Sequence, residues 1–362
     1  MIKIYQFHFI IRLKVISSTK LKLENILPAE RIMAERYNVT RVTARQAIKL
    51  LVEENYLETK HGSGTYISDR KPSVALNGNK IIGVLVPDIK RGIMIDLIRG
   101  IEDEAMAAGY NTILCNTDNL WDKANVYVNQ LLANGIKGVI YVPVQDIGNL
   151  SKKEDKNREI IEKFIKGNTP IVLADHKCKR ISTDLEVSDN FGGGFEMTEY
   201  LINMGHRRIA VVYDYDETSI EDRIAGHKEA LLKRKIEFNP ELVQKIKEFG
   251  LTKYFSDHIK MVINKLNATA IFAMNDLLAM DVYNHAKNLG YNIPNDISVV
   301  GYDDLQFADR METPLTTIRQ PLYQMGRESV KLFLERSQKI DDQLKKVILH
   351  NRLIIRKSVK RI

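Results

Sequence analysis

The chain has 362 residues, more than one domain usually holds, so two or three compact units are expected. Its apolar content of 44% and charged content of 28% are ordinary for a soluble globular protein. No apolar run reaches the roughly 18 residues that a membrane span requires, so a transmembrane class is not predicted.

The positive charge is concentrated at the N-terminal end. The formal net charge is +8, and residues 1–71 contain 13 Lys or Arg against 7 Asp or Glu, which leaves the rest of the chain close to neutral. A basic segment attached to a near-neutral body is typical of a domain that binds a polyanion. On charge alone, a solvated basic surface is the alternative.

The first residues, IYQFHFIIRLKVIS (4–17), are apolar enough to suggest a signal peptide. Polar and basic residues such as Arg12 and Lys14 interrupt the run, and no small-residue cleavage site follows, so it is interpreted as the first helix of the basic domain. The two cysteines, Cys115 and Cys178, are too few for a disulfide scaffold and show no metal spacing. A cytoplasmic location is therefore expected.

Residues 27–68 predict two helices followed by a hairpin. LPAERIMAERYNVTRVTARQAIKLL (27–51) predicts a helix over 29–37, a turn, and a second helix over 41–54, and YLETKHGSGTYIS (56–68) alternates on both sides of a glycine-containing turn. This order of elements is a winged helix-turn-helix. The apolar residues expected to pack the two helices together are Ile32, Ala34, Tyr37, Val39, Ala47, Ile48 and Leu51.

The second of these helices begins with polar residues, and its apolar residues come later. In a helix-turn-helix, the N-terminal end of the recognition helix enters the DNA major groove, where Arg can bond guanine and short hydroxyls can reach phosphates or base edges. The alternative is an exposed helix face stabilised by i,i+4 pairs. Arg41 and Arg45 are each other's i,i+4 neighbours, and like charges at that spacing repel, so contact with DNA is favoured.

The motifs LPAER, VTR and HGSGT, with the Arg at 45, resemble the GntR-type winged helix, a bacterial repressor DNA-binding domain. The resemblance covers about residues 27–68, and residues 1–26 depart from it. In that family, the Arg of the LPAER-like motif, the start of the recognition helix and the His–Gly of the wing contact operator DNA. The resemblance therefore implies that the DNA-binding residues are Arg31, Thr40, Arg41, Thr43, Arg45, His61 and Gly62.

A polar segment without periodicity, DRKPSVALNGNK (69–80), follows and is predicted to be a linker. We therefore assign 1–69 to the winged helix-turn-helix domain, 70–80 to the linker and 81–362 to a second module. There, short β-rich apolar runs alternate with amphipathic segments, which predicts an α/β fold with parallel sheets covered on both faces. The length fits two sheets. The apolar runs are IIGVLV (81–86), NTILC (111–115), GVIYV (138–142), PIVLA (170–174), RIAVV (208–212), AIFAM (270–274) and ISVVG (297–301).

The second module resembles the LacI-type effector domain, which is itself similar to periplasmic sugar-binding proteins. The segments that carry the resemblance include LIRGIEDEA, NGIKGVIYVP, PIVLAD, GHRRIAVV, MNDLLAMDVY, IPNDISVVGYDD and PLTTIRQP. With a GntR-type head, the whole chain is similar to the arabinose repressor group. The resemblance implies two Rossmann-like parallel-sheet lobes joined by three crossovers, near 184–189, 301–304 and 318–321. The first lobe would comprise about 81–186 and 303–319, and the second about 187–302 and 320–358.

Ligands of open α/β sheets bind beyond the carboxyl ends of the strands, where several polar residues of this chain lie. Sugar hydroxyls donate and accept hydrogen bonds, so planar charged groups that bond two neighbouring hydroxyls suit them. Asp175, Asn275 and Asp303 follow predicted strands, and Arg223 lies in the helix after RIAVV. By resemblance these four positions touch the effector, and Lys90, after IIGVLVPD, is a fifth candidate.

Other interpretations of these residues remain open. Asn275 is well placed as a helix N-cap and can serve both roles. Of the adjacent Asp303 and Asp304, one is expected to face the ligand and the other the hinge. Trp121 either stacks on an apolar sugar face or covers a lobe surface. The glycines of 192–194 do not fit a phosphate-binding loop and are expected to serve helix packing.

No catalytic motif is present, the eight histidines show no ligand spacing, and neither a metal nor a cofactor is expected. We therefore predict a dimeric, sugar-responsive, DNA-binding transcriptional regulator and not an enzyme. It would be a repressor released from double-stranded operator DNA by a monosaccharide, with L-arabinose as the first candidate by resemblance. An activator, a regulator that responds to a nucleoside or phosphosugar, and a transport-associated sugar-binding protein are the alternatives; the last leaves the basic head unexplained.

Overall fold

The computed structural model describes residues 28–36, 39–53, 57–60, 64–67, 80–90, 92–144, 150–179, 181–246, 252–338 and 343–362. The chain divides into two compact units, Met1–Gly78 and Asn79–Ile362, and the division falls within the predicted linker. The helix predicted near the N-terminus lies outside the described residues. Within the described part of the chain, no helix is long and apolar enough to cross a membrane.

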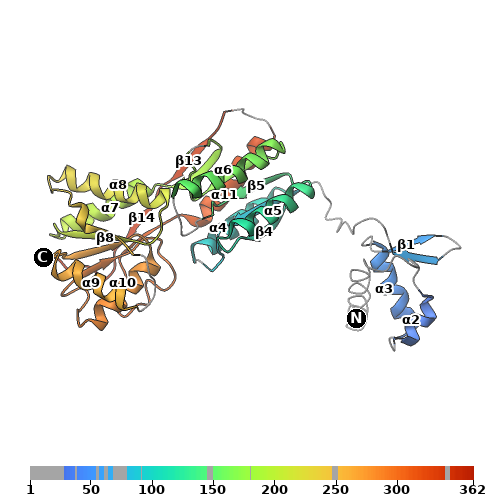
Figure 1. Cartoon of the computed structure of the whole chain (residues 1–362), viewed down its shortest axis with the longest axis horizontal. Helices are drawn as coiled ribbons and strands as arrows, with labels where there is room; N and C mark the ends of the chain where they lie inside the picture. Colours follow the sequence, from blue (N-terminus) through green and yellow to red (C-terminus); the bar gives the residue numbers. More distant parts are fainter. Residues whose placement is uncertain are drawn as a thin grey trace. The chain divides into compact units, whose positions relative to one another are not determined.

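The N-terminal unit contains α2 (Glu30–Arg36), α3 (Arg41–Glu53) and an antiparallel hairpin of β1 (Leu57–Lys60) and β2 (Gly64–Ile67), coloured blue in Figure 1. These are the predicted helix-turn-helix and wing. Its core contains Met33, Ala34, Ala44, Ala47, Ile48, Leu51 and Leu57.

The predicted packing of Ile32 in the core of this unit is wrong. Ile32 leaves 47% of its surface exposed, and its neighbour Met33 is buried instead. Ala34 and Met33 are adjacent on the helix, so the buried stripe of α2 is centred one position later than the sequence pattern suggested. Tyr37, also predicted to pack here, lies outside the described residues.

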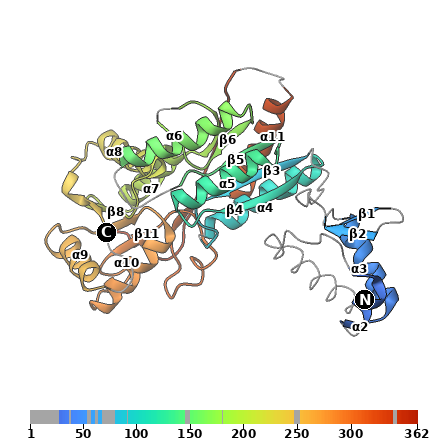
Figure 2. The same cartoon turned by 45° about the vertical axis from the view of Figure 1, so that its right-hand side comes forward.

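The first lobe of the larger unit is a six-stranded sheet in the order β13-β7-β6-β5-β3-β4, and all of its strand pairs are parallel. Helices α4 and α11 pack on one face, and α5 and α6 pack on the other (Figure 2). Because both faces are covered, the central strands are buried at every position. The elements are β3 (Ile81–Val86), α4 (Gly92–Ala107), β4 (Asn111–Asn116), α5 (Trp121–Ala133), β5 (Gly138–Tyr141), α6 (Leu150–Lys166), β6 (Ile171–Ala174), β7 (Asp184–Ser188), α11 (Leu322–Ser337) and β13 (Lys346–Leu349).

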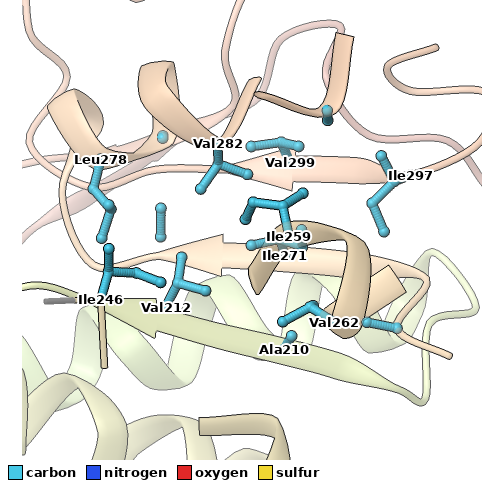
Figure 3. Packing of buried hydrophobic residues seen from close by; sticks show 14 of the residues in the cluster. Ala210, Val212, Ile246, Ile259, Val262, Ile271, Leu278, Val282, Ile297 and Val299 are labelled. Carbon is cyan, nitrogen blue, oxygen red and sulfur yellow. The ribbon is translucent and has the colours of Figure 1, made fainter. Parts of the chain in front are cut away.

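The second lobe has a parallel four-stranded sheet in the order β11-β10-β8-β9. Helices α9 and α10 cover one face, and Figure 3 shows their Ile259 and Val282 packed against Ile271 and Val299 of the strands. Helices α7 and α8 cover the other face. The elements are α7 (Asn190–Asn203), β8 (Ile209–Tyr213), α8 (Thr218–Lys233), the 3-10 turn η2 (Pro240–Leu242), β9 (Val243–Lys245), α9 (Lys253–Asn264), β10 (Ala270–Ala273), α10 (Asp276–Asn288), β11 (Ser298–Val300), and the pair β12 (Thr317–Arg319) and β14 (Arg352–Ile354).

The predicted assignment of 303–319 to the first lobe is wrong, and so is that of α11 and β13 to the second, whereas residues 352–358 lie with the second lobe as predicted. Met325 and Phe333 of α11 lie in the core of the first lobe, and β13 pairs with β7 at that sheet's edge. Conversely, Ala308 and Leu315 belong to the core of the second lobe. The apolar stripe of α11 shows that the helix packs on a sheet, but it does not show which of two similar sheets it covers.

Three crossings join the lobes in the described part of the chain. Two lie where they were predicted, at Asp189 after β7 and at residues 320–321 between β12 and α11. The third lies at residues 350–351, between β13 and β14, and the predicted crossing at 301–304 is wrong. That segment stays with the second lobe, because Gly301 N–H bonds the Thr316 carbonyl and Asp303 N–H bonds the Ile318 carbonyl.

Helices α7 and α8 pack at backbone distance. A Cβ atom at Gly194 would collide with the backbone of Arg223, which confirms that this glycine serves helix packing. Nearby, the Thr198 hydroxyl donates to the Gly194 carbonyl at 2.8 Å and lies 2.9 Å from His227 Nδ1, so it accepts from the imidazole N–H. Burial lowers the pKa of His227 to about 4.

We expect His227 to make the larger unit less stable at acidic pH. Its folded pKa lies below the ordinary value of 6.5, so its stabilisation is present above that value and is lost as pH falls towards the folded pKa. The loss at pH 5 is on the order of 2 kcal/mol. Urea unfolding at pH 7 and pH 5 measures it. His227→Asn retains a donor towards Thr198 but does not titrate. The difference in free energy of unfolding between the wild type and His227→Asn should therefore be smaller at pH 5 than at pH 7, by about 2 kcal/mol. The exposed His350→Asn is the control, and a gap that does not change with pH contradicts the prediction.

Candidate functional site

Thr40 directly precedes α3 and caps its N-terminus. Its Oγ1 accepts a hydrogen bond from the Thr43 backbone N–H at 3.2 Å and lies 2.9 Å from the Thr43 hydroxyl. This is the side-chain cap that helix N-termini favour, and it fixes where α3 starts. The first turn of α3 therefore has a defined position, with Arg41 as its first residue.

Helix α3 has one apolar face and one exposed face. Ala44, Ala47 and Leu51 lie in the core of the unit, whereas Arg41 and Arg45 are exposed. The polar first turn of the helix is thus not needed for packing, which leaves it available to another surface.

Arg45 contacts a carboxylate of the preceding helix. Its Nε lies 3.2 and 3.0 Å from the two carboxylate oxygens of Glu30, and its Nη2 lies 2.9 Å from the same group. The i,i+4 spacing used for prediction cannot find this pair, because the residues are 15 positions apart. Arg31, by contrast, forms an i,i+4 pair with Glu35 of the same helix, at 3.6 Å. Ion pairs this exposed are weak because water screens them, so a phosphate or a base can displace the carboxylate.

The exposed face of α3 also carries residues that the sequence prediction did not include. Val42 and Gln46 are exposed beside Arg45 on the same helix. Helical spacing alone places them there, since Gln46 follows Val42 by four residues. Of the predicted DNA-binding residues, His61 and Gly62 lie outside the described residues.

The five residues predicted to bind an effector line one cavity of about 400 Å³ between the two lobes. Lys90 and Asp175 come from the first lobe, and Arg223, Asn275 and Asp303 come from the second. All but Arg223 follow a strand of one of the parallel sheets, so the cavity lies where the carboxyl ends of the strands meet.

Arg223 is held in place by four neighbours. Its Nε donates to Asn190 Oδ1 at 2.8 Å, and its Nη1 donates to the Met274 carbonyl. Nη2 lies 3.7 Å from Asp303 Oδ1, and the guanidinium lies 3.6 Å from the centre of the Tyr302 ring. These contacts fix the plane of a buried cation that faces the cavity.

Asp303 and Asp304 lie in a backbone conformation that non-glycine residues rarely adopt, with φ of 117° and 57°. Asp303 accepts from Gln320 Nε2 at 2.7 Å, and burial raises the pKa of Asp303 to about 7 although Arg223 opposes the shift. Asp304 accepts from Arg319 and Arg356, each at 2.6 Å. Asp303 therefore lines the cavity, and Asp304 connects β12 to the C-terminal segment.

Asp276 anchors the loop that contains these two aspartates. Its Oδ2 accepts from the Leu305 backbone N–H at 2.8 Å, and its Oδ1 accepts from the Thr317 hydroxyl at 2.6 Å. Burial, together with the nearby charge of Asp303, raises the pKa of Asp276. The carboxyl group of Asp276 thus positions the loop without lining the cavity itself.

Asn275 serves both as a cap and as a cavity residue. Its Oδ1 accepts from the Leu278 backbone N–H at 2.8 Å, which caps α10. Its Nδ2 donates to both oxygens of Asp214, at 3.1 and 3.0 Å. The amide therefore orients the Asp214 carboxylate at the wall of the cavity.

His176 links the lobes at another wall. Its Nε2 lies 3.4 Å from Asp175 of the first lobe and 3.3 Å from Glu217 of the second. Next to it, Lys177 Nζ donates to the Asp222 carboxylate of α8 at 2.8 and 2.6 Å. These contacts hold the two lobes together across one edge of the cavity.

Two weaker candidates have different outcomes. Lys90 is exposed and lines the cavity. It also lines an adjoining cavity of about 550 Å³, together with Arg319 and Gln320.

Trp121 is only 7% exposed and packs in the core of the first lobe, with Lys156 Nζ 5.4 Å from its ring centre. Of the two alternatives for Trp121, cover of the lobe is therefore the one that the structure supports, and stacking on a ligand is not.

The sequence prediction missed several carboxylates of the cavity. Asp88, Asp214, Glu217 and Asp281 line it together with Asp175 and Asp303, which makes six carboxylates. Asp214 comes directly after β8, so the rule that found Asp175 after β6 would also have found Asp214. Among the described residues, no group of three His, Cys, Asp or Glu side chains is arranged to hold a metal ion.

Family models match both units of the chain. The model for bacterial regulatory proteins of the gntR family matches residues 13–67, and the model for the periplasmic binding protein-like domain matches residues 198–359. The first match begins before residue 27, so it includes part of the segment that departs from the expected motifs.

Known regulators are similar to most of the chain. The arabinose metabolism transcriptional repressor of Geobacillus stearothermophilus is 28% identical over 354 residues, 96% of this chain and 95% of its own length. The probable HTH-type transcriptional regulator EndR of Paenibacillus polymyxa is 30% identical over 282 residues, 76% of this chain and 79% of its own. The structure of a LacI family transcriptional regulator from Enterococcus faecium with bound ribose is 30% identical, with a TM-score of 0.65, and covers 78% of this chain and 100% of its own.

We expect Arg45→Ala to weaken binding to a selected DNA duplex by about 1–3 kcal/mol, because it removes a planar donor from the exposed face of α3. Fluorescence anisotropy at two salt concentrations measures the affinity and its salt dependence. Arg234→Ala is a matched control in the larger unit, since Arg234 Nε also lies 3.0 and 3.1 Å from a carboxylate, that of Glu199. Unchanged DNA affinity in Arg45→Ala would mean that Arg45 only ties α3 to Glu30.

Proposed function

This chain belongs to the LacI-type family of bacterial transcriptional regulators, with a GntR-type DNA-binding domain at its N-terminus, and we propose that it is a sugar-responsive repressor. The N-terminal unit binds double-stranded operator DNA, and the cavity of the larger unit takes a monosaccharide that releases the DNA. The observation that carries the proposal is the set of carboxylates around Arg223, in one cavity between two lobes.

The charge of the cavity favours an uncharged, hydroxyl-rich ligand. Six carboxyl groups face it against the two cations Lys90 and Arg223, so acidic groups outnumber cations even though burial raises the pKa of Asp303 to about 7. Carboxylates accept hydrogen bonds from sugar hydroxyls but repel phosphate, so a phosphosugar is disfavoured. A nucleoside base usually needs a flat apolar surface, and among the described lining residues only Tyr215 and His176 offer a ring. The most similar relatives include a repressor of arabinose metabolism and a ribose-bound regulator, and L-arabinose is our first candidate.

The cavity is connected to the crossings between the lobes. Gln320 donates to Asp303 and accepts from the Ser188 hydroxyl at 2.6 Å, so a ligand that contacts Asp303 acts on two of the crossings. A ligand held between the lobes stabilises their closed arrangement. We further propose that the protein is a homodimer formed through the larger unit, which presents two recognition helices to a pseudopalindromic operator.

Coupling between the two sites must be reciprocal. If sugar weakens operator binding, operator weakens sugar binding by the same factor, typically about 5- to 150-fold. A titration of operator binding against a panel of pentoses, hexoses, nucleosides and phosphosugars should identify one uncharged sugar with this effect. The proposal fails if the full-length protein binds its selected operator and no sugar of the panel changes the affinity.

Asp303→Asn should lower sugar affinity at least tenfold, or about 1.4 kcal/mol, and leave operator affinity unchanged. The oxygen of the introduced amide can still accept from Gln320, so the loop keeps its conformation, but the acidic group that would accept from sugar hydroxyls is lost. Calorimetry with the identified sugar and a gel shift with the operator measure the two affinities. Asp309→Asn changes an exposed carboxylate of the same lobe and is the control. Normal sugar binding in Asp303→Asn would remove this residue from the ligand site.

A further inference from the structure

The recognition helix carries an apolar side chain on the face that is expected to meet DNA. Val42 leaves 65% of its surface exposed in the first turn of α3. At 100° per residue, it lies on the face opposite Ala47 and Leu51, between Arg45 and Gln46 in angular position. The core of the N-terminal unit therefore does not require Val42.

A valine at this position cannot make the contacts that its neighbours make. Arg41 and Arg45 can bond guanine or phosphate, whereas an isopropyl group has no donor or acceptor. In the major groove, the 5-methyl group of thymine is the one apolar feature that a base pair presents. Valine is stiff at χ1, so it loses little side-chain entropy on contact.

We propose that Val42 is a specificity-determining residue that recognises the methyl group of a thymine next to the base contacted by Arg41 or Arg45. The inference rests on the proposed DNA-binding function of the N-terminal unit. Charge complementarity brings the phosphate backbone to this face, because Arg41 and Arg45 lie on either side of Val42 in the sequence and both are exposed. The operator half-site then contains thymine at a defined position.

The test replaces thymine by uracil, which removes only the methyl group. The full-length protein first selects its operator from a random duplex pool, and each thymine of the half-site is then replaced in turn. We expect one replacement to weaken wild-type binding by about three- to tenfold, the effect of one buried methyl group. The same replacement should have no effect on Val42→Ala, whose affinity for the unmodified operator should be lower by a similar factor.

Ile32→Ala is the matched control, since it truncates an exposed apolar residue of α2 and should keep the wild-type response to uracil. If no single replacement affects the wild type, or if a replacement affects the wild type and Val42→Ala equally, the inference is overturned. Both outcomes leave operator binding itself intact. Failure to select any duplex would instead reject the proposed function.

Discussion

The candidate ligand site depends on two consecutive aspartates held in a left-handed backbone. Such a conformation costs about 1–3 kcal/mol per residue, so neighbouring contacts must stabilise it. Asp276 accepts a hydrogen bond from the Leu305 backbone N–H of this loop, Gln320 donates to Asp303, and Arg319 and Arg356 donate to Asp304. The loop turns Asp303 towards Arg223 while it stays attached to the second lobe. One short segment thus forms a wall of the cavity and contacts a crossing between the lobes.

The two units use opposite charge for different partners. The N-terminal unit presents Arg41 and Arg45 on an exposed helix face, where a polyanion can replace the Glu30 carboxylate. The larger unit gathers six carboxylates inside a cavity, where hydroxyl groups can replace water. An anion attracted to the first site is repelled from the second. In the proposed function, this separation keeps nucleic acid and phosphate from competing for the proposed sugar site.

Local sequence predicted the elements better than their assignment to lobes. Strand runs such as IIGVLV and helix starts such as Thr40 are set by nearby residues, and both were found at the expected positions. The lobe that receives α11 depends on contacts more than 200 residues apart, such as Arg327 with Glu104, which no local pattern encodes. The third crossing was misplaced for the same reason, because β13 pairs with β7 across more than 150 residues.

The site residues show the same division. A polar residue within a few positions after a strand is a local signal, and Asp175, Asn275 and Asp303, which it selected together with the family resemblance, line one cavity. Pairings distant in sequence could not be predicted: Arg45 with Glu30, and Asn275 with Asp214, although the strand-end rule locates Asp214 itself. The sequence left two alternatives open for Trp121 because a helix start near a strand end can face either the cavity or the core, and the apolar ring is more stable in the core.

The hydrogen bonds of the cavity indicate where its selectivity comes from. The Arg223 guanidinium is held by Asn190, by the Met274 carbonyl and by the charge of Asp303, and the Asn275 side chain is held by Leu278 and Asp214. A ligand therefore meets groups whose orientation is already fixed. Fixed orientation lowers the entropy lost on binding and penalises a hydroxyl in the wrong place. In the proposed function, selectivity between sugars that differ at one stereocentre rests on the rigidity of Arg223 and Asp303, whereas the acidic surroundings set only the class of ligand.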